Sequence, residues 1–319
     1  MNLTIATDPV DVIGTAEILA GGTDLSERLR SGVTQRDLID ITKLPGLDTI
    51  TGGGGEPLTI GALVTIARLA DDERVAKDHP CLAAPARTLA TPQIRSMGTL
   101  GGVLCQRTRC WYYRHPHLHC FKDGGDSCPA REGNNHYGVA FDLGPCVYPH
   151  PSSIALGLLA YDATFDTSTR TTVPIAELFG NGSDPTRDHQ LAADEVLLRV
   201  TLPPAGRREH AAYVRLMSRR WAEWPLVECV VRLAVDDNGV IATARVCLGA
   251  VANIPRRSSV VEDALIGQRA DVDDPTLARA AALAVADANP LPQTAYKLPL
   301  ITATVLDTLE RALSSSTTD

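Results

Sequence analysis

Hydrophobic and polar positions divide the first part of the chain into short alternating segments. We expect a helix over residues 11–30 that runs into a Gly-Gly turn, because AEILAGGTDLSERLR changes from apolar to charged. Residues 37–44 alternate like a short strand, and residues 57–70 read as a strand followed by the start of a helix. Between them, TGGGG at 51–55 predicts a flexible hairpin tip. A helical pattern returns at 81–91.

The second part of the chain begins with a more strongly apolar pattern. SSIALGLLAYDATFDT (152–167) predicts a helix leading into a strand, and residues 170–179 and 195–204 are each strand-like. From about residue 210 the apolar residues alternate on both sides of Asp237-Asn238-Gly239, which is a strong hairpin signal.

A helical pattern dominates the C-terminal region. We expect a pair of helices at about 258–267 and 274–287, then one amphipathic helix in TAYKLPLITATVLDTLERAL and a frayed tail, SSSTTD. The chain therefore reads as an α+β protein with two domains, residues 1–207 and residues 208–319. Its length of 319 residues, with 44% apolar and 21% charged residues, suits a soluble protein with more than one core.

Charge and hydropathy exclude several classes of function. The formal net charge of −8 argues against general nucleic-acid binding. No apolar segment approaches the roughly 20 residues that a membrane span needs. The first residues lack the basic and apolar regions of an export signal, so we expect a cytoplasmic protein. The alternative is a periplasmic location reached by export of a folded complex on a partner's signal.

Two glycine turns are candidate phosphate-binding loops: Ala20-Gly21-Gly22-Thr23-Asp24 and Gly98-Thr99-Leu100-Gly101-Gly102. Glycine lets the backbone approach a pyrophosphate closely, and threonine adds a hydroxyl donor. Neither loop fits the dinucleotide fingerprint G-x-G-x-x-G or the Walker pattern, so a Rossmann site and a P-loop NTPase are not supported. Taken alone, each pair of glycines is better explained as a tight turn.

With their flanks, the two loops become specific. ILAGGTDL followed about 75 residues later by IRSMGTLGG resembles the FAD-binding subunits of the molybdenum hydroxylases, the xanthine dehydrogenase and carbon monoxide dehydrogenase group. The resemblance runs essentially end to end and includes IGALVTIARLA, EVLLRVTLPP and AYKLPL. It implies two FAD-binding subdomains of the vanillyl-alcohol-oxidase (PCMH) type, followed by a small α+β C-terminal domain of the carbon monoxide dehydrogenase flavoprotein type.

The resemblance also implies which residues contact FAD. Leu197 would contact the isoalloxazine, and Arg215 stands where relatives usually place a lysine near the flavin. Ser153 stands where relatives commonly carry an aspartate near FAD, so a carboxylate is lost there. The other implied contacts, mainly with the pyrophosphate, are Glu17, Ile18, Leu19, Ala20, Gly21, Gly22, Thr23, Asp24, Leu25, Gly98, Thr99, Gly101 and Gly102.

A cysteine-rich insert at 103–148 interrupts the first domain. Five of the eight cysteines and four of the eight histidines lie in this region, a concentration typical of a metal or metal–sulfur site. The insert resembles that of the aldehyde oxidoreductase and 4-hydroxybenzoyl-CoA reductase subset, which binds a [4Fe–4S] cluster. The resemblance assigns the four ligands to Cys110, Cys120, Cys128 and Cys146. Cys105 is expected to be a buried free thiol, although it could replace one of the four.

Other interpretations of the insert stay open. Zinc could be held by cysteines together with histidines at 115, 117, 119 and 136, but compact C-x₂₋₄-C pairs are absent, and a disulfide is the less favoured third reading. We expect the histidines of HPHLH to lie at the surface and Trp111-Tyr112-Tyr113 to cover the cluster. The three remaining cysteines, in apolar segments, are expected in the core: Cys81, Cys229 and Cys247.

The insert also carries three arginines, at 107, 109 and 114. One interpretation is a positive shell that raises the potential of the cluster. The other is ion pairing within the insert, with Asp123, Asp126 or Glu132.

The chain shows no catalytic triad, no carboxylate pair and no molybdopterin motif, so it is not expected to transform an organic substrate alone. The resemblance implies an electron-transfer subunit with FAD and a [4Fe–4S] cluster. Its expected partners are a molybdopterin-binding large subunit, a [2Fe–2S] small subunit and a ferredoxin-like or other external acceptor. An aldehyde is the first expectation for the substrate of the whole complex. The alternatives are a stand-alone flavin oxidase and a non-catalytic metal-binding scaffold protein.

Overall fold

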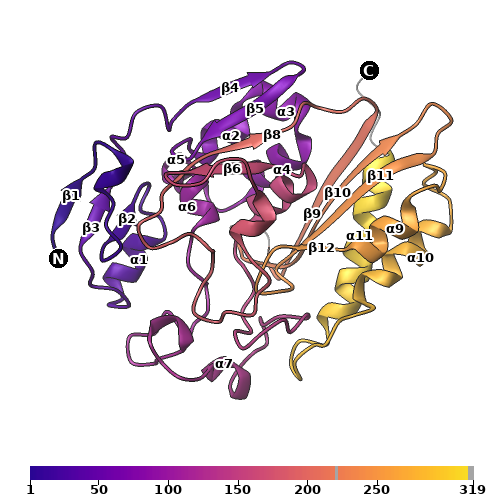
Figure 1. Ribbon diagram of the computed structural model, residues 1–319. Coiled ribbons are helices and arrows are strands. Elements are labelled where there is room, and N and C mark those ends of the chain that lie inside the picture. Colours follow the sequence, from indigo (N-terminus) through magenta and orange to yellow (C-terminus); the bar gives the residue numbers. More distant parts are fainter. Residues whose placement is uncertain (220–221, 315–319) are drawn as a thin grey trace.

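The computed structural model describes residues 1–219 and 222–314, which form three sheets that follow one another along the chain (Figure 1). The first sheet is parallel and has the order β1-β3-β2, with helix α1 (Leu25–Arg30) between its second and third strands in sequence. Its small core, around Ile39 and Ile41, also includes Leu63 and Val196 of the next subdomain. The strands are β1 (Leu3–Ile5), β2 (Glu17–Leu19) and β3 (Leu38–Asp40).

The single helix predicted over 11–30 is wrong. Residues 17–19 are strand β2, in which Ile18 pairs with Ile39 of β3, and only residues 25–30 are helical. The Gly-Gly turn separates the two elements, because Gly22 has a φ of +70°, a left-handed conformation that cannot continue either a strand or a helix. The predicted turn is thus present, but it joins a strand to a helix.

The second sheet has five strands in the order β4-β5-β8-β6-β7, and every neighbouring pair is antiparallel. Helix α8 (Ser153–Ala160), which is buried along its whole length, packs with α4 (Pro80–Thr88) in the core that this sheet covers. The strands are β4 (Ile50–Gly53), β5 (Glu56–Gly61), β6 (Thr164–Thr167), β7 (Val173–Pro174) and β8 (Leu197–Leu202). The other helices of this subdomain are α2 (Ile66–Asp71), α3 (Glu73–Asp78), α5 (Pro92–Met97) and α6 (Leu100–Leu104).

Sequence patterns predicted most of this subdomain correctly. The glycine-rich tip of the β4–β5 hairpin, the strand and helix at 57–70, and the helix and strand at 152–167 are confirmed. The segment 170–179 is a strand only at Val173–Pro174 and continues as a 3-10 helix, Ile175–Leu178. Pro174 has no N–H to extend the ladder, which accounts for the early end of this edge strand.

The C-terminal unit is a four-stranded antiparallel sheet, in the order β12-β11-β10-β9, covered by helices on one face (Figure 1). The predicted Asp-Asn-Gly hairpin joins β10 to β11, with Gly239 at a φ of +77°. The predicted final helix is confirmed, and the predicted frayed tail lies outside the described residues from 315 onward. The elements are β9 (Glu209–Met217), β10 (Pro225–Val235), β11 (Ile241–Gly249), β12 (Arg256–Arg257), α9 (Ser259–Leu265), α10 (Thr276–Ala282) and α11 (Lys297–Ser314).

The cysteine-rich insert forms a separate lobe that contains the short helix α7 (Pro129–Glu132) and lies against both domains (Figure 1). Its small core includes Cys110, Cys120 and Tyr113. Hydrogen bonds tie it to the C-terminal unit: the Thr294 hydroxyl donates to the Val139 carbonyl at 2.8 Å. Although the insert belongs to the first domain in sequence, it braces the second one in space.

The predicted α+β class, with two subdomains in the first part and a small C-terminal unit, is confirmed. The two parts share apolar surface, because Val230 of β10 and Cys247 of β11 belong to the core of the five-stranded sheet. Cys81, Cys229 and Cys247 are all buried, as predicted. Among the described residues, no helix is both long and apolar enough to cross a membrane.

Candidate cofactor site

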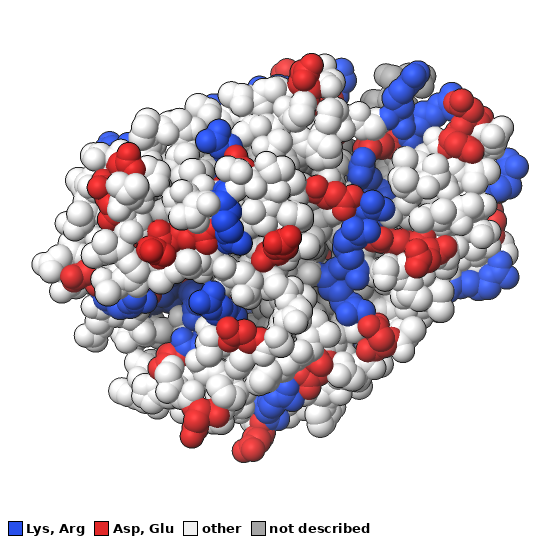
Figure 2. Space-filling view, viewed as in Figure 1, with Lys and Arg blue, Asp and Glu red and all other residues white. Residues whose placement is uncertain are grey.

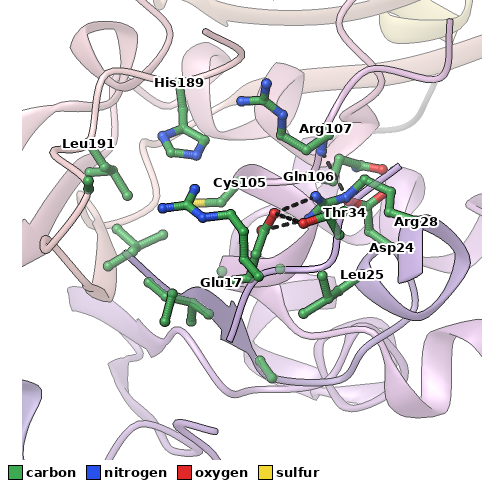
Figure 3. A pocket seen from close by; sticks show the side chains of 18 of the residues that line it. Glu17, Asp24, Leu25, Arg28, Thr34, Cys105, Gln106, Arg107, His189 and Leu191 are labelled. Atoms are coloured by element: carbon green, nitrogen blue, oxygen red, sulfur yellow. Dashed lines mark hydrogen bonds and ion pairs between the residues drawn. The ribbon is translucent and has the colours of Figure 1, made fainter. Parts of the chain in front are cut away.

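A cleft of about 600 Å³ opens where the three-stranded subdomain, the five-stranded subdomain and the insert meet (Figure 3). Both predicted glycine loops line it. Of the predicted FAD contacts, the structure brings the following into its walls: Glu17, Ile18, Ala20, Gly21, Gly22, Thr23, Asp24, Leu25, Thr99, Gly101, Gly102 and Leu197. Leu19, Gly98, Ser153 and Arg215 are not among its lining residues.

The two glycine loops touch each other at the base of the cleft. A Cβ added to Gly21 would lie 1.8 Å from the carbonyl oxygen of Met97, so only glycine fits there. The second loop is more ordered than the expected flexible loop, since Leu100–Leu104 is helix α6. Thr99 caps this helix by accepting a hydrogen bond from the Gly102 N–H at 3.1 Å.

One wall of the cleft is a buried ion pair that sequence reasoning did not detect. The guanidinium of Arg28, on α1, donates to both carboxylate oxygens of Glu17, on β2, at 2.8 and 2.9 Å, and the Thr34 hydroxyl donates to the same carboxylate (Figure 3). Burial alone would raise the pKa of Glu17, but these partners, above all Arg28, lower it. The pair fixes β2 and α1, the two elements joined by the first glycine loop.

Asp24 connects the first glycine loop to the insert. Its carboxylate lies 2.6 Å from Arg114 Nη2 and 3.1 Å from Arg109 Nη2, and it accepts from the Arg107 N–H at 3.2 Å. Burial would raise the pKa of Asp24, but the charges of Arg109 and Arg114 outweigh it and lower the pKa. Basic side chains gather where the N-terminal subdomain meets the insert on the face shown in Figure 2.

The insert arginines therefore pair differently from the expectation of partners at Asp123, Asp126 or Glu132, which is wrong. Their acidic partners are Asp24 and Glu27 near α1, and Asp188 in the loop that precedes β8. The insert folds back onto α1, so that residues far apart in sequence are closer than its own acids. Proximity in sequence was the only guide available, and it pointed to the wrong partners.

The opposite wall combines the insert with the loop before β8. Lys122, Arg187, His189 and Leu191 line it, and none of them was predicted. The last three lie in residues 180–191, which carry no periodic pattern or motif. Burial lowers the pKa of His189 to about 4, so its imidazole is neutral at pH 7.

Ser153 and Arg215 lie together, but in a buried cluster apart from the cleft walls. Arg215 Nη1 donates to Ser153 Oγ at 2.9 Å and to Glu228 Oε1 at 2.8 Å, while Ser153 Oγ donates to Glu228 at 2.7 Å. Burial raises the pKa of Glu228 despite the neighbouring guanidinium of Arg215. The cluster joins α8 to strands β9 and β10, across the boundary between the two domains.

The four predicted cysteine ligands are neighbours in the insert. Burial raises the pKa of Cys110 to about 12, and the charges of Cys146 and Cys128 add to this rise. The same two cysteines raise the pKa of Cys120, after burial, to about 11. All eight cysteines carry free thiols in the structure. Within residues 1–219 and 222–314, no three His, Cys, Asp or Glu side chains are grouped so that they could hold a metal ion.

Cys105 differs from these four in position. It follows α6, lines the cleft and is only partly buried, whereas a buried thiol was predicted; the surrounding protein raises its pKa to about 12, and the charge of Glu195 adds to this rise. Around the other cysteines, Tyr113 is buried in the same small core, whereas Trp111 is 59% exposed. The histidines at 115, 117 and 119 are exposed, as predicted.

Comparison with known proteins places this fold and cleft in a family. Residues 4–205 match the model of the FAD binding domain in molybdopterin dehydrogenase. The chain belongs to that family. Residues 212–312 match the CO dehydrogenase flavoprotein C-terminal domain, so the second part of the chain is also of the family's type. A stand-alone flavin oxidase would be expected to carry a substrate-cap domain in this region. The match to a flavoprotein C-terminal domain therefore favours the subunit type.

Curated relatives agree over almost the full length. The aldehyde oxidoreductase FAD-binding subunit PaoB of Escherichia coli K12 is 33% identical over 307 residues, which cover 93% of this chain and 91% of that protein. The carbon monoxide dehydrogenase medium chain of Hydrogenophaga pseudoflava is 25% identical over 273 residues, 85% of this chain and 79% of that one. The chain is thus an FAD subunit of the molybdenum hydroxylase type.

Solved structures share the fold. Quinoline 2-oxidoreductase from Pseudomonas putida 86 superimposes with a TM-score of 0.74 at 22% identity, over 98% of this chain and 96% of that one. Carbon monoxide dehydrogenase from Hydrogenophaga pseudoflava gives the same values.

Proposed function

We propose that this chain is the FAD-binding, electron-transferring subunit of a heteromeric molybdenum-containing hydroxylase, and that FAD binds in the 600 Å³ cleft. The observation that carries the proposal is the meeting of both glycine loops at the base of one cleft. When bound, FAD can exchange either one or two electrons, and the protein sets the redox properties of the cofactor through burial and nearby charge. The chain's own residues hold the cofactor and exclude water. We set the domain boundary at 207/208, directly before β9.

The proposed FAD contacts fall into two groups. The glycine loops, with Thr23 and Thr99, would hold the pyrophosphate through backbone N–H groups and hydroxyls, and Leu197 would lie against the isoalloxazine. Two cationic side chains of the cleft, Arg36 and Arg187, favour a ligand with negative charge. The remaining proposed contacts rest on the family resemblance alone, because they do not line the cleft: Leu19, Gly98, Ser153 and Arg215.

We further propose a [4Fe–4S] cluster held by Cys110, Cys120, Cys128 and Cys146. Support comes from their mutual electrostatic influence inside one lobe and from the separation of Cys105. A cubane takes one thiolate at each of four corners, so its ligands surround a volume and do not converge on a single point. The four thiols would lose their protons on binding iron.

The proposed partners are a molybdopterin-binding large subunit, a [2Fe–2S] small subunit and a ferredoxin-like or other electron acceptor. The relative with 33% identity is named as a subunit of an aldehyde oxidoreductase, which supports an aldehyde as the substrate of the whole complex. The cytoplasm is the proposed compartment, and co-export to the periplasm with a partner is the alternative.

The test uses the full chain purified without oxygen, with flavin, iron and sulfide quantified and EPR recorded after dithionite. The expected result is one FAD with about four irons and a reduced-cluster signal. Serine variants of the four ligand cysteines should each lose iron, while Cys105→Ser, the matched control, should keep it. FAD without iron would remove the cluster from the proposal and keep the flavoprotein. Folded protein with neither cofactor would overturn the proposal.

A further inference from the structure

A buried carboxylate joins the insert to the wall of the cleft. Asp188 Oδ1 lies 2.9 Å from the ammonium of Lys122, and Asp188 Oδ2 lies 3.1 Å from Nε of Arg107. The Lys122 ammonium also donates to the Arg187 carbonyl at 2.6 Å. Both members of the Lys122–Asp188 pair are buried. Burial alone would raise the pKa of Asp188, but Arg107 and Lys122 outweigh it, so the group is an ionised carboxylate.

The two partners of Asp188 differ in where they are fixed. Arg107 precedes the first proposed ligand, Cys110, whereas Lys122 lies between Cys120 and Cys128. Lys122 is therefore the cation whose position depends on the folding of the loop between two proposed ligands. When that loop is folded, its ammonium reaches the loop before β8.

The loop before β8 forms the cleft wall on the other side of this contact. Asp188 faces the insert, while its neighbour His189 faces the cleft together with Leu191 (Figure 3). Arg107 Nη2 holds the same loop through the Thr186 carbonyl at 3.3 Å. Cations of the insert thus fix this loop at both Thr186 and Asp188. The placement of the wall depends on the insert.

Building on the proposed function, we propose that Asp188 is a positioning residue that couples FAD binding to the folded, cluster-bearing insert. A folded insert fixes Lys122, which fixes Asp188 and with it the wall that His189 and Leu191 present to FAD. Because coupling between two binding sites is reciprocal, bound FAD should strengthen retention of iron by the same factor. No electron transfer between the two cofactors is needed for this effect.

The experiment measures the FAD dissociation constant of the full chain by titration, with iron bound and after anaerobic chelation. In the wild type we expect affinity to fall about tenfold on iron removal, within the usual range of coupling between sites. In Asp188→Asn, which keeps the shape of the side chain, affinity should be weaker throughout and the ratio between the two states should fall below about threefold. A general loss of stability would change both constants and leave their ratio intact.

Asp184→Asn is the matched control, because Asp184 lies in the same loop, is exposed and forms its ion pair with Arg187 of that loop. It should keep the wild-type ratio. If Asp188→Asn does not fold, Lys122→Met takes its place, because Asp188 then keeps its ion pair with Arg107. Lys122→Met should reduce the ratio of the two FAD dissociation constants in the same way. The coupling would be overturned if iron removal left the FAD dissociation constant of the wild type unchanged. It would also be overturned if Asp188→Asn and Lys122→Met both kept the tenfold ratio between the iron-free and iron-bound states. Absence of FAD or iron from wild-type protein would instead mean that the proposed function had failed.

Discussion

Replacing Gly21 with alanine tests whether contact between the two glycine loops builds the cleft. The added Cβ would lie 1.8 Å from the Met97 carbonyl oxygen and 2.7 Å from its carbon, whereas ordinary contacts begin at 3.4 Å. Both atoms belong to the backbone, so no side chain can rotate away. The loops must therefore separate by roughly 1.5 Å, a severe case of overpacking.

We expect Gly21→Ala to lower the free energy of unfolding by about 2–3 kcal/mol, the upper part of the range for overpacked sites. FAD should bind at least about tenfold more weakly, because the two loops that line the cleft are forced apart. A tenfold change in affinity corresponds to about 1.4 kcal/mol of binding free energy. Urea unfolding of the FAD-free protein, followed by circular dichroism, measures the first quantity, and FAD titration measures the second.

Gly54→Ala is the control. Gly54 has a φ of +67° and no atom within 4 Å of an added Cβ, and it lies outside the cleft, at the β4–β5 hairpin. It should cost about 1 kcal/mol of stability through its backbone conformation alone and leave FAD affinity unchanged. A Gly21→Ala protein with the stability and FAD affinity of the wild type would refute the reasoning.

Two further predictions concern buried charges. Arg215→Met should lower the free energy of unfolding by about 3–5 kcal/mol, because it leaves Glu228 buried without its cation. Adding Glu228→Gln should recover most of this loss. Thermal unfolding checks both expectations, and equal melting temperatures for the single and the double variant would contradict the second. Burial lowers the pKa of Lys297 to about 7, below its unfolded value of 10.5, so the unfolded chain binds more protons between these values. The free energy of unfolding should consequently rise from pH 7 to pH 9.5 by up to about 1.4 kcal/mol per pH unit. Urea unfolding measures it, and the midpoints of Lys297→Met should lack this rise.

The sequence predicted elements well where one local signal decides the structure. The Asp-Asn-Gly hairpin, the glycine-rich tip of β4–β5 and the last amphipathic helix each depend on a few neighbouring residues, and all are confirmed. The predicted helix over 11–30 failed because its apolar residues are equally compatible with a strand. Pairing of Ile18 with Ile39, a tertiary contact, decided between the two.

The candidate site divides in the same way. The glycine loops were visible because close backbone approach requires glycine at Gly21, a constraint that appears directly in the residue type. Arg28 and Asp188 were not visible, since an arginine or aspartate in an aperiodic or helical segment has no signature until its partner is known. The arginines of the insert were noticed, but their partners on α1 depend on how the insert folds back.

The attachment of the three-stranded subdomain has a consequence for the kinetics of cofactor exchange. The small core of this subdomain reaches the five-stranded subdomain at Leu63, Val196 and Leu198, whereas the five-stranded subdomain and the C-terminal unit share a larger core, so the cleft lies along the less extensively packed boundary. At the edge of the cleft, Arg109 and Arg114 of the insert form ion pairs with Asp24 and Glu27. Entry and release of a bulky cofactor should require residues 1–40 to move away from the insert as a hinged unit. Breaking these ion pairs should then limit the rate of cofactor exchange.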